Sequence, residues 1–183
     1  MRKLYRIGAL VAVILFSIGT ALGTGTQEAS AASGFQYCAY FASGNVSCLN
    51  AWGGGPLVNV YTSGPTGTAN NYFQIRYESN GNIELQFSGG GQWNGYCIGD
   101  SYNDSTNASA MLDNCGDLSG NGAGWGTQMQ LQQWGPGGPC PVGDYAFFDW
   151  HWHGYLGPPA PFSNGSRFYL NKPQNNPICF AQQ

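Results

Sequence analysis

Apolar and polar residues alternate in short runs along most of the chain, and Gly, Asn or Pro separates one run from the next. Residues 73–77 and 83–87 both alternate in this way, and Asn80-Gly81 between them is a hairpin-turn signal. No segment beyond residue 31 carries the 3.6-residue stripe of an amphipathic helix. The pattern predicts an all-β protein whose short strands close into a barrel or sandwich, since closure removes exposed strand edges.

The N-terminal segment has a different pattern. Three basic residues fall within the first six positions, an apolar stretch covers 7–22, and Ala29-Ser30-Ala31 has the small-x-small pattern of a cleavage site. The apolar stretch is shorter than the ~20 residues that span a bilayer, which favours a signal peptide over a retained anchor. We therefore expect a signal peptide at 1–31, a single exported domain at 32–183, and no membrane association after cleavage.

Cysteine usage agrees with export. An even number of cysteines in an exported chain predicts three disulfides, although six cysteines allow 15 pairings. Two His residues and the absence of a CxxC pair argue against a metal site. The six cysteines all follow residue 31: Cys38, Cys48, Cys97, Cys115, Cys140 and Cys179.

The amino-acid composition excludes some classes of protein and of ligand. The chain has 15 charged residues against 27 aromatic residues, 29 Gly and 16 Asn. Disordered chains have the opposite balance, and so few basic residues exclude a surface that follows nucleic-acid phosphates. Polar chemistry therefore comes mainly from amides and hydroxyls, which suit a neutral ligand.

A threefold repeat is visible in two sets of short segments. The opening segments begin 49 and 50 residues apart, and the closing segments begin 56 and 39 residues apart. Self-similarity at such a period is typical of repeat architectures. The openings are Cys48-Leu49-Asn50, Cys97-Ile98-Gly99-Asp100 and Phe147-Phe148-Asp149, and the closings are residues 71–75, 127–131 and 166–170.

The repeat segments resemble those of the ricin-type β-trefoil lectin modules. Cys48-Leu49-Asn50 is similar to the family's opening turn, with Asn in place of Asp, and Asn70-Asn71-Tyr72-Phe73 is similar to its closing signature, with Phe in place of Trp. The segment from Cys97 to Cys115 looks like the family's internal disulfide loop. The resemblance covers residues 35–183 and implies a β-trefoil with a Cys97–Cys115 disulfide.

The resemblance also implies a carbohydrate site in the first repeat. The family binds sugar through an opening acid, a strand amide, a stacking aromatic residue and an Asn near the closing signature. These positions carry over to Asn50, Asn59, Tyr61 and either Asn70 or Asn71. Alternation along a strand places Asn59 and Tyr61 on one face. The other interpretation is an Asn-rich turn with an exposed Tyr.

The third repeat offers a second candidate platform, made of Asp149, Trp152 and Tyr155. If residues 149–153 form a strand, Asp149, His151 and His153 share one face, which leaves a metal site as an alternative. We expect no metal, because such His spacing is common in turns.

Two other parts of the repeat are expected to be structural. Trp150 and the neighbouring Phe147 and Phe148 are predicted core residues, because large aromatic side chains dominate cores. In the second repeat Asp113 replaces the stacking aromatic residue and only Trp125 could substitute, so we expect no sugar site there.

Catalysis is not expected. The sequence has no GxSxG or HExxH motif, and Glu78 and Glu84 are expected to face solvent on a hairpin. The predicted function is a secreted, monomeric, non-catalytic module that needs no cofactor and binds a glycan, such as a cell-wall polysaccharide. Two alternatives stay open: a structural or cell-surface protein without a defined ligand, and a protease inhibitor that uses the loop at 135–141.

Overall fold

The computed structural model describes residues 33–100, 108–116, 126–133, 140–150, 152–172 and 177–183. The predicted signal peptide at 1–31 lies outside these residues. In the part of the chain that is described, no helix is long and apolar enough to cross a membrane. Apart from two single turns of 3-10 helix, η1 (Trp52–Gly54) and η2 (Ala69–Asn71), the regular structure there is β-strand.

Six strands form an antiparallel barrel. Each pairs with the next in the order β12, β1, β4, β5, β8 and β9, and a bridge between Tyr145 and Phe180 connects the last strand back to the first. Closure leaves few unpaired strand edges. The barrel strands are β1 (Phe35–Tyr40), β4 (Tyr72–Tyr77), β5 (Ile83–Phe87), β8 (Met129–Gln133), β9 (Tyr145–Asp149) and β12 (Ala181–Gln182).

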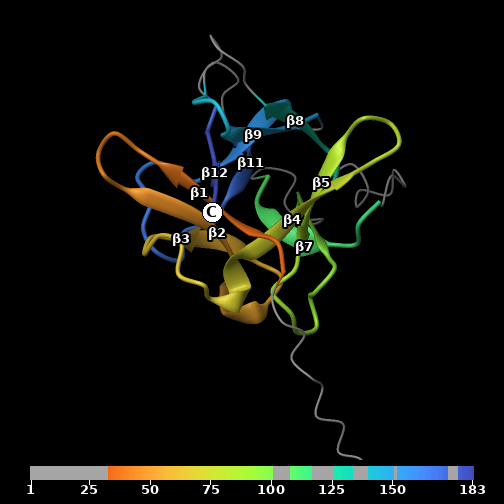
Figure 1. Ribbon diagram of the computed structural model, residues 1–183, viewed down its shortest axis with the longest axis horizontal. Coiled ribbons are helices and arrows are strands. Elements are labelled where there is room, and N and C mark those ends of the chain that lie inside the picture. The colour runs from red at the N-terminus through yellow and green to blue at the C-terminus, as the bar shows by residue number, and fades with distance from the viewer. Residues whose placement is uncertain (1–32, 101–107, 117–125, 134–139, 151, 173–176) are drawn as a thin grey trace, which may run out of the picture.

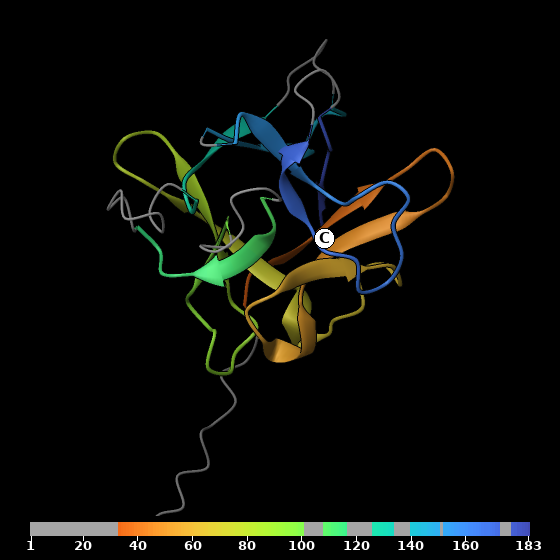
Figure 2. The ribbon, with the colours of Figure 1, turned by 180° about the vertical axis from the view of Figure 1, so that it is seen from behind.

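Three hairpins cover one end of the barrel. Their second strands meet, because three isolated bridges join residues within or just before β3, β7 and β11. Figures 1 and 2 show the three groups of strands arranged around a common centre. This is the predicted β-trefoil with pseudo-threefold symmetry. The hairpins are β2 (Val46–Ala51) with β3 (Val58–Tyr61), β6 (Cys97–Asp100) with β7 (Ala110–Asp113), and β10 (Gly154–Gly157) with β11 (Tyr169–Lys172).

All three repeats contribute to one apolar core. The predicted alternation is confirmed on β5, where Ile83, Leu85 and Phe87 are at most 1% exposed and belong to that core. Phe147 packs edge-on against Tyr37, with ring centroids 5.6 Å apart, so β9 and β1 are joined at the barrel seam. Burial of these side chains supplies most of the drive to fold.

The two segments predicted to open and close the third repeat each lie one strand earlier than their counterparts in the first two repeats. Phe147-Phe148-Asp149 lies on β9, the counterpart of β1 and β5, whereas the true counterpart of the first two openings is β10. Likewise, residues 166–170 enter β11 rather than the last strand of the repeat. The even spacing of the openings was misleading because the connections differ in length, with five residues between β4 and β5 and eleven between β8 and β9.

All six cysteines pair, one disulfide to each repeat. Cys97–Cys115 is confirmed, and the other two are Cys38–Cys48 and Cys140–Cys179. Disulfides persist in oxidising environments, so the three pairs indicate that the chain folds in one.

Candidate functional site

Of the predicted first-repeat residues, Asn50, Asn59 and Tyr61 lie on the face of the β2–β3 hairpin opposite the core, and Asn70 and Asn71 lie on η2. Asn50 is the register partner of Asn59, and Cys48 is the partner of Tyr61. Leu49 and the other alternate residues of these strands belong to the core. The expected placement of Asn59 and Tyr61 on one face is therefore confirmed.

The Asn side chains converge, but beneath the surface. Asn50 Nδ2 donates a hydrogen bond to Asn71 Oδ1, and Asn59 Nδ2 donates to the Gly165 carbonyl at 2.9 Å. Asn50, Asn59 and Asn71 are only 4%, 5% and 0% exposed. Asn59 Oδ1 and Asn71 Nδ2 have no hydrogen-bond partner among the described residues. We call these three residues the amide cluster; it holds η2 and the loop containing Gly165 against the hairpin.

An exposed aromatic ring lies beside the amide cluster. Trp52 is 39% exposed, and a Cβ placed on Gly165 would lie 3.4 Å from Trp52 Cη2. At the last residue of η1, a Cβ on Gly54 would lie 3.8 Å from Asn70 Oδ1. Asn70 and Tyr61 are both half-buried. We call Trp52, Asn70 and Tyr61 the Trp52 surface.

Sequence reasoning missed Trp52. A usable signal was present, because Trp52 follows a strand and precedes three consecutive Gly residues. A large aromatic residue in so short and Gly-rich a turn has little chain nearby to cover it. The prediction followed the family's positions, and three of the Asn residues at those positions are buried.

The third-repeat candidates do not meet on one exposed surface. Asp149 is fully buried, and its Oδ1 accepts a hydrogen bond from the Trp152 backbone N–H at 2.8 Å. Trp152 packs against the central core. Tyr155 is 6% exposed and donates a hydrogen bond from its hydroxyl to Gln132 Oε1 at 2.5 Å. These contacts stabilise a turn and one end of the barrel.

The turn after β9 overturns two expectations. Residues 149–153 do not form one strand, because β9 ends at Asp149 and β10 begins at Gly154. Alternation therefore does not place Asp149 and His153 on a shared strand face, and His151 lies outside the described residues. Trp150, expected in the core, is 49% exposed, whereas Phe147 is fully buried as predicted.

Of the second-repeat candidates, the structure describes Asp113 on β7 but not Trp125. Asp113 Oδ1 accepts a hydrogen bond from the Asn114 backbone N–H at 2.7 Å, a local turn contact. Trp125 and most of the inhibitor loop, residues 135–139, lie outside the described residues.

Glu84 differs most from its expected environment. We expected it to face solvent, but it is 0% exposed. Its Oε1 accepts hydrogen bonds from the Gly116 N–H at 2.6 Å and the Thr127 hydroxyl at 2.8 Å, while Arg76 Nη1 lies 3.6 Å from Oε2. Burial raises the pKa of the Glu84 carboxyl, and the hydrogen bonds and Arg76 offset part of that effect.

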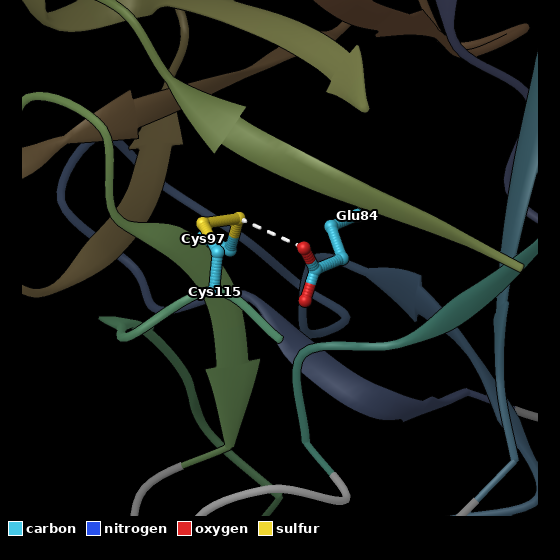
Figure 3. A group of neighbouring side chains, drawn as sticks. All are labelled: Glu84, Cys97 and Cys115. Atoms are coloured by element: carbon cyan, nitrogen blue, oxygen red, sulfur yellow. Dashed lines mark hydrogen bonds between the residues drawn. A yellow bond between two sulfur atoms is a disulfide. The ribbon is translucent and has the colours of Figure 1, made fainter. Parts of the chain in front are cut away.

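The Glu84 carboxylate points at the Cys97–Cys115 disulfide, as Figure 3 shows. Cys97 Sγ lies 3.7 Å from Oε2, and because a disulfide sulfur carries no proton, we treat this as a packing contact. Both sulfurs are bonded to each other, so the group offers no thiolate to a metal. Its role is to bind the loop after β7 to the barrel.

Comparisons with known proteins support the architecture. No protein-family model matches the sequence, and no curated protein matches it either. Among solved structures, the designed threefold-symmetric protein ThreeFoil aligns with a TM-score of 0.56 and 16% identity, covering 82% of this chain and 98% of that chain. A likeness at this identity shows the fold alone, and that fold is the β-trefoil already evident in the strand pairing.

Proposed function

We propose that this protein is a non-catalytic carbohydrate-binding module, exported through residues 1–31 and active as a monomer outside the cell. The proposal is supported by a trefoil fold, by disulfides suited to an oxidising environment, and by the Trp52 surface. The ligand we propose is a neutral glycan, such as a cell-wall polysaccharide. No cofactor or metal is required.

The exposed Trp52 ring beside the amide cluster carries the proposal. A sugar ring offers C–H groups that pack on an aromatic face and hydroxyls that exchange hydrogen bonds with amides. In this arrangement Trp52 is the stacking platform, Asn70 supplies an amide at its edge, and Tyr61 supplies a second aromatic contact. Ligand sites typically combine such an apolar surface with few, well-placed polar groups.

The amide cluster acts as support in this proposal. Asn59 fixes the Gly165 backbone on which the Trp52 ring rests, and Asn71 anchors η2, which carries Asn70. Rigid support lowers the entropy lost when a ligand orders the site. Asn50 donates a hydrogen bond to Asn71 and is the register partner of Asn59, so loss of its side chain should weaken binding indirectly.

The test measures retention of the exported chain, residues 32–183, on a panel of insoluble and immobilised polysaccharides. We expect retention by at least one polysaccharide and a fall of about tenfold in affinity, or ~1.4 kcal/mol, for Trp52→Ala. Trp150→Ala is the matched control, because Trp150 is also exposed, at 49%, and lies outside the site. Retention by no polysaccharide, or equal loss in both variants, would contradict the proposal.

A further inference from the structure

A pocket elsewhere on the molecule shares no residue with the Trp52 surface. It has a volume of about 440 Å³, within the range of roughly 300–1,000 Å³ that is usual for small-molecule sites. It opens between the β1–β2 turn, the segment after β10, and the residues around the end of β11. We call it the proline pocket, and its lining includes Phe41, Pro158, Pro159, Pro161, Phe162, Lys172 and Ile178.

Apolar side chains make up most of its wall. The Phe41 and Phe162 rings contact each other, with centroids 5.1 Å apart and planes inclined at 50°. Ile178 packs against the central core and also lines the pocket. Three prolines restrict the backbone on one side, so the wall loses little freedom when a ligand enters.

Among the described residues that line the pocket, Lys172 alone is charged. Its stem is held in place: a Cβ on Gly157 would lie 2.8 Å from Lys172 Cγ and 2.7 Å from Ile178 Cγ1. Its ammonium lies 4.9 Å from the centre of the Tyr169 ring, a cation–π contact. The ammonium therefore has a defined position over the Tyr169 ring, and the Lys172 side chain lines the pocket.

Among the described residues, no carboxylate pairs with this cation. Within the described residues, the salt bridges join Arg76 to Glu78 and to Glu84, and none involves Lys172. Burial lowers the pKa of the Lys172 ammonium. A partly desolvated charge without an anionic partner is unfavourable, so an anion that enters the pocket gains more from pairing than it would in water.

We propose that the proline pocket binds a small organic carboxylic acid, with its carboxylate paired to Lys172 and its apolar body between Phe41 and Phe162. A single ammonium matches the single charge of a carboxylate. Phosphate sites, by contrast, usually offer Arg forks or clusters of backbone N–H groups, and the lining contains no Arg. The proposal is independent of carbohydrate binding.

The test uses trans-cinnamate as the probe, with cinnamamide as its neutral isostere, in titrations followed by calorimetry and backbone amide NMR shifts. We expect cinnamate to bind at least tenfold more tightly than cinnamamide, with shifts centred on Phe41, Phe162 and Ile178. Lys172→Met keeps the stem and removes the charge, so it should abolish the preference for cinnamate and retain weak binding of cinnamamide. Phe162→Ala should weaken binding of both compounds.

Two controls separate the pocket from general effects. Arg167→Met removes a cation outside the lining and should leave the preference unchanged, and Trp52→Ala should bind cinnamate as the unmodified chain does. Circular dichroism checks that each variant folds. Equal affinity for the two compounds in the unmodified chain, no binding of cinnamate, or a preference that survives Lys172→Met would overturn the proposal.

Discussion

At the scale of single residues, Glu84 is a polar side chain that distant parts of the chain bury. Its strand pattern is that of a solvent-facing position, since its neighbours Ile83 and Leu85 point into the core. The cover comes from Gly116 and Thr127, which lie 32 and 43 residues further along the chain. Local alternation could therefore predict which side of the strand Glu84 occupies but not its burial.

The raised pKa of Glu84 predicts a pH effect on stability. Because its folded-state pKa lies above the ordinary value of 4.5, the folded state holds the proton more tightly than the unfolded state. The contribution of this group is therefore most favourable below about pH 4.5 and becomes less favourable as pH rises through the raised pKa.

Glu84→Gln should remove this dependence. We expect the difference in unfolding free energy between the variant and the unmodified chain to change between about pH 4.5 and pH 7, in favour of the variant at the higher pH. Urea titrations across that range measure it. Asp144→Asn tests the same effect at a second carboxyl group, because burial also raises the pKa of Asp144. A pH-independent difference for Glu84→Gln would contradict the assignment.

At the scale of elements, the sequence predicted strands and turns better than it predicted which strands are equivalent. The hairpin pattern at 73–87 is observed as β4 and β5. The third repeat was displaced because strand equivalence depends on spatial position, whereas loop lengths vary between repeats.

The candidate site follows the same pattern. Alternation placed Asn59 and Tyr61 on one face, as observed. It could not show that Asn59 is covered, because its partner Gly165 lies 106 residues away. Exposure of Trp52 is likewise decided by packing with a distant loop.

Close approach between β10 and β11 gives a prediction for Gly154. A Cβ there would lie 2.6 Å from the Cα and carbonyl carbon of Asn171, which are backbone atoms of the partner strand. We expect Gly154→Ala to destabilise the fold by about 1–3 kcal/mol, the usual cost of overpacking. Gly157→Ala should cost less, since it meets the side chains of Lys172 and Ile178, which can move. Chemical denaturation of both variants measures the order, and a reversed order would count against this packing.

At the scale of the whole molecule, closure of the barrel depends on its last few residues. Phe180 is fully buried, and its ring packs on Phe147 and Phe168 with centroids 5.6 and 6.1 Å away. Its backbone N–H and carbonyl both hydrogen-bond to Tyr145. One residue therefore joins the C-terminal segment to β9 and to the core.

Phe180→Ala should be severely destabilising. Removing a buried Phe costs about 3–5 kcal/mol, a large part of the roughly 5–15 kcal/mol that stabilises an ordinary domain. Thermal unfolding of the exported chain measures the loss. Phe35→Ala is the control, because Phe35 is 47% exposed, and its effect should be small. Similar losses in the two variants would show that the seam matters less than this packing indicates.

The placement of the disulfides has a consequence for how the chain could be cut or rearranged. Each disulfide closes a loop within its own repeat, with separations of 10, 18 and 39 residues, and none connects one repeat to another. The disulfides therefore form three separate covalent rings that follow one another along the chain. A single cleavage in the turn at 78–82 would leave two pieces held together only by strand pairing and the shared core. The same arrangement allows new termini at that turn without disturbing any ring.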